Sequence, residues 1–104
     1  MRKDPEVALE VAKIFKLIKD ISPGKAVELR VPPYGAIQCG EGATHRRGMP
    51  SNQVEMSADT LIHLAIKPES WSGLISQGQI RASGLASDLA MLFTQVLAKY
   101  QAEI

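Results

Sequence analysis

Cys39 and His45 are the two side chains of this sequence best suited to nucleophilic chemistry. A cysteine thiolate beside a histidine, with a carboxylate such as Glu41 or Glu55 to orient the ring, would form a thiol nucleophile. Cys39, however, lies in a strand pattern on the same side as Ile37, and an unmodified cysteine is commonly a small buried apolar residue. The sequence therefore predicts a structural cysteine and no catalytic residue. A small cysteine-dependent enzyme is the less favoured hypothesis.

Neither a metal ion nor a nucleotide is predicted as a cofactor. The chain has one cysteine and two histidines, and these lack the C-x-x-C or H-x-x-x-H spacing that places several ligands around one ion. His63 falls in the middle of a predicted helix, as a surface or boundary residue. The run Gly40-Glu41-Gly42 lacks the third glycine and the following helix of a dinucleotide-binding turn. We expect no cofactor.

Arg46 and Arg47 follow Thr44 and His45 in a loop that contains glycines. They are the residues best suited to hold an anionic group. Guanidinium groups and exposed backbone N–H groups suit a carboxylate or a phosphate. If the protein carries an amphipathic molecule, these arginines are predicted to contact its head group. The simpler interpretation, which we favour from the sequence alone, is a solvated loop tip or ion pairs with nearby glutamates.

The composition is that of one ordinary folded domain over residues 1–104. The chain is 45% apolar and 22% charged, with a formal net charge of +1, so it has no general attraction to nucleic acid or to an anionic membrane. Charged residues interrupt the apolar positions near the N-terminus, and no run of apolar residues is long enough to span a bilayer. We therefore expect a cytoplasmic protein without integral membrane association. Its single cysteine cannot form an internal disulfide.

Apolar residues at helical spacing predict four helices. They cover residues 5–21, 58–66, 68–77 and 88 to nearly the end of the chain. Asp4, Ser57 and Ser87 stand where N-caps are expected, and Asp4 is followed by a proline at the first helical position. Gly78 supplies the backbone conformation that ends the third helix.

Four short segments with alternating apolar residues predict strands. They are Val27–Val31, Ala36–Cys39, Asn52–Met56 and Gln79–Ser83. The first three are predicted to form an antiparallel meander, with Val54 and Met56 pointing inward. The element order αβββααβα predicts a single α+β domain, in which helices cover one face of a mostly antiparallel sheet of four to five strands.

Two stretches of the chain resemble a known family. The first is GQIRASGLASDLAML from Gly78 to Leu92, and the second is VELRVPPYGAIQCGEGATHRRGMPSNQVE from Val27 to Glu55. Together they resemble the bacterial, mainly actinobacterial, branch of the sterol carrier protein family, whose members have an SCP2-like fold. The resemblance implies a non-enzymatic protein that binds or carries a lipid, a sterol or another apolar small molecule in a cavity between the sheet and the helices.

The residues predicted to line that cavity share helical spacing on the three C-terminal helices. They are Leu61, Leu64, Trp71, Leu74, Ile75, Leu89, Leu92, Phe93 and Val96. The same spacing describes any helix that packs on a sheet, so a filled core is the competing interpretation.

A second functional hypothesis is a protein-interaction domain that has no lipid ligand and serves a thiol-dependent metabolic enzyme. Copurified lipid would favour carriage, and a protein that binds no lipid would favour docking.

Overall fold

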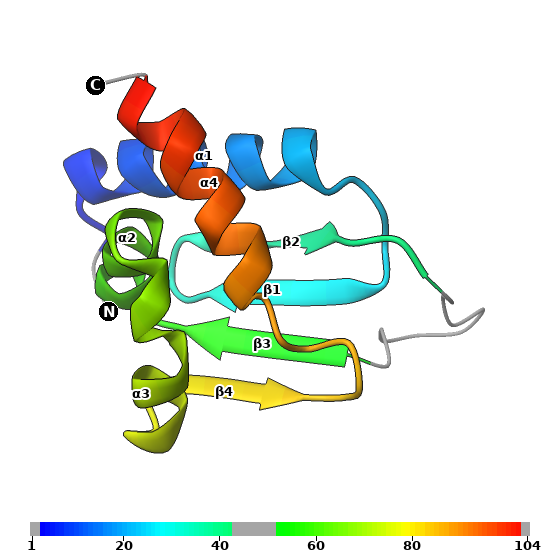
Figure 1. Ribbon diagram of the computed structural model, residues 1–104. Coiled ribbons are helices and arrows are strands. Elements are labelled where there is room, and N and C mark those ends of the chain that lie inside the picture. The colour runs from blue at the N-terminus through cyan, green and yellow to red at the C-terminus, as the bar shows by residue number, and fades with distance from the viewer. Residues whose placement is uncertain (1–2, 43–51, 103–104) are drawn as a thin grey trace.

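The computed structural model describes residues 3–42 and 52–102 of the chain. The elements follow the predicted order, with a short 3-10 helix, η1, before the third α-helix. They are α1 (Pro5–Ile21), β1 (Val27–Val31), β2 (Gly35–Cys39), β3 (Asn52–Met56), α2 (Ala58–Ile66), η1 (Pro68–Ser70), α3 (Trp71–Ser76), β4 (Ile80–Ser83) and α4 (Ala90–Ala102). Figure 1 shows the four strands side by side, with α2 and α3 at the end of the sheet where β3 finishes and β4 starts.

The strand order in the sheet is β2-β1-β3-β4. Strands β1 and β2 form the expected antiparallel hairpin, and β4 is antiparallel to β3. The predicted meander is wrong at its third strand, because β3 runs parallel to β1 and lies on the side of β1 away from β2. Parallel neighbours need a crossover connection of about a dozen residues. The segment 40–51 has that length, so the direction of β3 depends on a connection and not on local strand propensity.

Alternation along the strands separates an apolar face from a polar face. Leu29, Val31 and Val54 point toward the helices and are fully buried, whereas Glu28 and Arg30 on the opposite face keep contact with solvent. Helix α1 contributes an apolar stripe to the same core through Val11, Ile14, Leu17 and Ile18. Burial of such stripes is the main source of stability for a domain of this size.

Two of the three predicted N-caps are confirmed. The Asp4 carboxylate accepts a hydrogen bond from the backbone N–H of Glu6 at 2.8 Å. The Ser57 hydroxyl accepts one from the backbone N–H of Thr60 at 3.2 Å. These contacts satisfy N–H groups in the first turns of α1 and α2.

The predicted cap at Ser87 is wrong, because α4 begins at Ala90. The Ser87 hydroxyl instead donates to the carbonyl of Gly84 at 2.8 Å, and the Asp88 carboxylate accepts from the backbone N–H of Ala90 at 2.9 Å. Ser87 is therefore used to close the turn after β4. This leaves residues 84–89 as an irregular connection between β4 and α4.

Candidate functional site

Most of the residues predicted to line a cavity lie in the packed core. Leu61, Leu64, Phe93 and Val96 are fully buried, and Trp71, Leu89 and Leu92 are nearly so. The rings of Trp71 and Phe93 stack with their centroids 6.2 Å apart. Side chains of the protein therefore fill the space between α4 and the sheet where these residues meet.

The other two predicted residues lie at the margin of this core. Leu74 is partly buried against it, and Ile75 is 36% exposed. Ile75 borders an open depression, whereas its helix neighbour Trp71 belongs to both the core and the depression. The structure thus brings eight of the nine predicted residues into one apolar cluster, and it places Trp71 and Ile75 beside the depression.

We call this depression the β4 groove. It has a volume of about 550 Å3 and is lined by Trp71, Ile75, Gly78, Ile80, Arg81, Ala82, Ser87 and Asp88. It exists because the helix layer covers β4 at Ile80, which is buried, but stops short of Ala82. Ala82 points toward the helix side of the sheet, as its register partner Val54 does, yet Ala82 is exposed while Val54 is fully buried.

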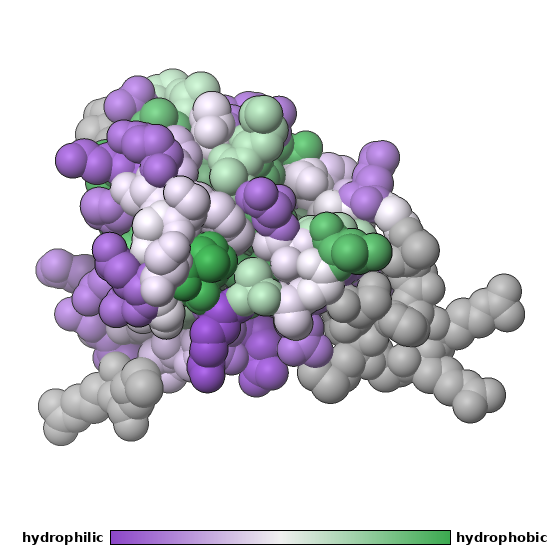
Figure 2. All heavy atoms as spheres, turned by 60° about the horizontal axis from the view of Figure 1, so that its bottom comes forward, coloured by the Kyte–Doolittle hydropathy of each residue, from purple (hydrophilic) through white to green (hydrophobic). Residues whose placement is uncertain are grey.

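Apolar side chains line the part of the groove that lies against the sheet. Ile80 and Ala82 form its floor, and Trp71 and Ile75 of α3 form one side. Asp88 at its margin is engaged by the backbone N–H of Ala90. Figure 2 views the molecule from the β4 side, where hydrophobic residues form small groups between hydrophilic ones. The groove is therefore an apolar depression with a polar border, which suits a small apolar or amphipathic molecule.

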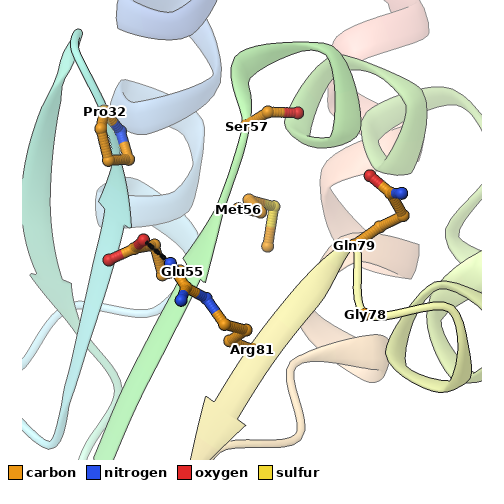
Figure 3. Close-up of a pocket in the computed structure, with 7 residues that line it drawn as sticks. All are labelled: Pro32, Glu55, Met56, Ser57, Gly78, Gln79 and Arg81. Carbon is orange, nitrogen blue, oxygen red and sulfur yellow. Dashed lines mark hydrogen bonds and ion pairs between the residues drawn. The ribbon is translucent and has the colours of Figure 1, made fainter.

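A second pocket of about 380 Å3 adjoins the groove and shares Gly78 and Arg81 with it. Figure 3 shows its lining, with Arg81 of β4 paired to Glu55 of β3 across the strands. Arg30 of β1 lies 4.0 Å from the other carboxylate oxygen of Glu55. This pocket reaches the helix-free side of the sheet, where a ladder of alternating charges crosses β1, β3 and β4.

Arg46 and Arg47, the predicted head-group residues, lie outside the described residues, and so does His45. Arg81 is a described cation that lines both depressions, and it is not among the residues predicted from the sequence. Strand alternation in Gln79–Ser83 already separated Arg81 from Ile80 and Ala82. The signal that was lacking is the pairing of β4 with β3, which places Arg81 beside Glu55.

Cys39 does not lie in a nucleophilic environment. Its side chain is fully buried, and desolvation raises the pKa of the thiol to about 11. A reactive cysteine needs a lowered pKa and access to solvent, so the geometry agrees with a structural role. In the described part of the chain, no three side chains of His, Cys, Asp or Glu gather closely enough to hold a metal ion. Over residues 3–42 and 52–102, no helix is sufficiently long and apolar to cross a bilayer.

These features define a class of protein: a small α+β domain with helices on one face of a four-stranded mixed sheet and an apolar groove at one edge. Among solved structures, the chain is similar to one titled "UbiJ-SCP2 Ubiquinone synthesis protein". The TM-score is 0.53 at 15% sequence identity, and the match covers 97% of each chain. This likeness establishes the SCP2-like fold.

The family model described as "Bacterial SCP ortholog" matches residues 3–94. The chain therefore belongs to this family of bacterial sterol carrier protein orthologues. The family resemblance and the α+β fold expected from the sequence are both confirmed. Comparison with curated protein sequences gave no match.

Proposed function

We propose that this protein binds an apolar or amphipathic small molecule, such as a lipid, in the β4 groove and performs no chemistry on it. Family membership supports ligand binding in general, and the observation that favours this site is the exposed Ala82 on the helix side of the sheet. A ligand chain lying there would cover Ala82 as the helix layer covers the rest of that face, and it would contact the exposed side chain of Ile75. Removal of apolar surface from water supplies the binding free energy.

The groove is favoured over the packed interior on energetic grounds. An interior void of ~300 Å3 would cost roughly 7 kcal/mol at about 24 cal/mol per Å3, which is comparable to the whole stability of a small domain. Filled packing around Phe93 and Val96 avoids that cost. The β4 groove is already open, so a ligand can enter it without displacing α4.

Trp71 provides a direct test, because it is the one tryptophan of the chain and it lines the groove. A fatty acid that carries a nitroxide on its chain quenches tryptophan fluorescence only at short range. We expect saturable quenching of Trp71 in protein that has been stripped of copurified lipid. Native mass spectrometry before stripping would show whether the protein already holds such a molecule.

Two matched alanine substitutions locate the site. Ala82→Glu places a carboxylate on the apolar floor of the groove and should weaken binding by about tenfold or more, since burying a charge without a partner is costly. Ala36→Glu places the same carboxylate on the helix-free face of β2, at another exposed strand position, and should change affinity less than about twofold. Equal affinity of both variants would exclude the groove. Absence of quenching in the wild-type protein would instead favour the protein-docking function.

The contact of Arg46 and Arg47 with a ligand head group is part of this proposal. Replacing both by alanine should weaken binding of the charged fatty acid more than binding of its uncharged methyl ester. An equal effect on the two ligands would remove the arginines from the site.

A further inference from the structure

Strand β4 is an edge strand with one side open. It pairs with β3 on its inner side, and among the described residues no strand lies beyond it. Figure 1 shows β4 at the border of the sheet, whereas α1 runs along the side of the other edge strand, β2. Proteins normally shield such edges with a helix, a proline, a bulge or charges. The sequence Ile80-Arg81-Ala82-Ser83 contains no proline and one charge.

The charges on the helix-free face form a ladder whose sign alternates from strand to strand. Arg30 of β1 is the register partner of Glu55 of β3, and Glu55 is the register partner of Arg81 of β4. Arg81 pairs with one carboxylate oxygen of Glu55, and Arg30 lies 4.0 Å from the other. The next position across the sheet, beyond Arg81, favours a negative charge because opposite charges on paired strands attract.

The positions beside Arg81 on β4 indicate which residues should flank the acidic residue of an added strand. Ile80 and Ala82 face the β4 groove, so residues opposite them on an added strand would also face it and should be apolar. An added strand of the pattern apolar–acidic–apolar would therefore continue both faces of the sheet. The side chain of Arg81 is 75% exposed, which leaves its guanidinium accessible from the open side.

We propose that β4 is a docking edge for an extended peptide segment of a partner protein, with an acidic residue opposite Arg81 flanked by two apolar residues. The peptide adds as a fifth strand and makes main-chain hydrogen bonds along Ile80–Ser83. A second copy of this chain is a poorer occupant. Its own β4 contains no acidic residue, so self-pairing offers Arg81 no opposite charge.

The test uses wild-type protein stripped of lipid and two fluorescein-labelled peptides, Thr-Val-Glu-Val-Thr and Thr-Val-Lys-Val-Thr. Fluorescence anisotropy should show that the Glu peptide binds at least about fivefold more tightly than the Lys peptide. In Arg81→Glu protein this preference should reverse. Lys16→Glu, a charge reversal on the exposed face of α1, should leave the preference unchanged.

Main-chain pairing is tested separately from charge. Two versions of the Glu peptide, each N-methylated at alternate residues, block opposite edges of the added strand. One version should lose binding by at least about tenfold and the other should keep it, because only one edge of a strand faces β4. Amide NMR resonances of residues 80–83 should shift more than those of β2.

The proposal is overturned if the two peptides bind wild-type protein equally or not at all, or if both N-methylated versions bind alike. A concentration-dependent dimer in sedimentation experiments that perturbs the β4 amides would also contradict it, because a second copy would then be the occupant. None of these results affects quenching of Trp71 by a nitroxide fatty acid, so failure of this proposal and failure of the ligand-binding function are distinguishable.

Discussion

At the scale of single residues, Cys39 shows why a residue type alone does not make a catalytic site. Its thiol is fully buried, and loss of hydration raises the pKa of the thiol to about 11 from an ordinary value of 9.0. The strand pattern with Ile37 already favoured an inward position. Burial then removes the thiolate, which is the nucleophilic form.

We therefore expect Cys39 to resist alkylation in the native protein. Iodoacetamide at pH 8 should modify it at least about 100-fold more slowly than in guanidinium-unfolded protein, because both burial and the raised pKa reduce accessible thiolate. Mass spectrometry of timed samples measures the two rates. Modification at similar rates in both states would contradict a buried structural thiol.

Tyr100 and Glu10 form a contact between the last helix, α4, and the first helix, α1. The Tyr100 hydroxyl donates to the Glu10 carboxylate, and Lys13 lies 3.5 Å from the other Glu10 oxygen. The Tyr100 hydrogen bond, with a further contribution from Lys13, lowers the pKa of Glu10. Desolvation, together with the same hydrogen bond, raises the pKa of Tyr100 to about 12.

Stability should therefore depend on pH in two windows. A lowered carboxyl pKa in the folded state stabilises the fold above the ordinary value of 4.5, and this contribution is lost as pH falls through the folded pKa. A raised tyrosine pKa stabilises the fold below pH 10, and this contribution is lost as pH rises toward 12. Between these windows, Tyr100→Phe should cost about 1 kcal/mol in urea unfolding, allowing for partial exposure of Glu10. A cost that stays the same from pH 3 to pH 9 would contradict the pairing.

At the scale of elements, local signals and the β1–β2 hairpin could be predicted from the sequence, whereas the pairing of β3 with β1 could not. Asp4 and Ser57 act within one helical turn, so their caps could be predicted from the residues beside them. Strand β3 has an ordinary alternating sequence, but its parallel pairing with β1 depends on a crossover. Ser87 has the right type for a cap, yet the turn after β4 uses its hydroxyl.

The candidate site was predictable only in part for the same reason. Trp71 and Ile75 follow from helical spacing, which marked them as apolar residues on one face. The exposure of Ala82 depends on how far the helices extend over the sheet. The periodicity of residues within one element carries no information about that extent. Arg81 gained its partner Glu55 only when β4 paired with β3.

The close approach of the segment before β1 to the segment after β2 can be tested by substituting two glycines. Gly24, before β1, has φ of +139°, and a Cβ there would lie 1.9 Å from the carbonyl oxygen of Gly40 after β2. Gly24→Ala should lower the free energy of unfolding by roughly 2 kcal/mol or more, because it combines backbone strain with a clash against backbone. Gly73 of α3 has open space around its Cβ position, so Gly73→Ala should be neutral or stabilising by up to about 1 kcal/mol. Equal effects in urea unfolding would show that residues 24 and 40 do not approach closely.

At the scale of the whole molecule, the helix layer does not cover the full width of the sheet. Helices cover the inner face of β1 and β3, where Leu29 and Val54 are fully buried. They leave the inner face of β4 open at Ala82. An apolar ligand and an added strand would each cover part of this uncovered margin. The ligand would lie on the face of β4, whereas the strand would lie along its edge.

The most direct test of the account is the location of a bound apolar chain. In an NMR experiment with ¹³C-labelled dodecanoic acid and lipid-free protein, we predict nuclear Overhauser effects from the ligand methylenes to the Trp71 ring and the Ala82 methyl group. Nuclear Overhauser effects to Leu64 and Val96 without any to Ala82 would contradict the account, because they would place the ligand in the interior that protein side chains now fill.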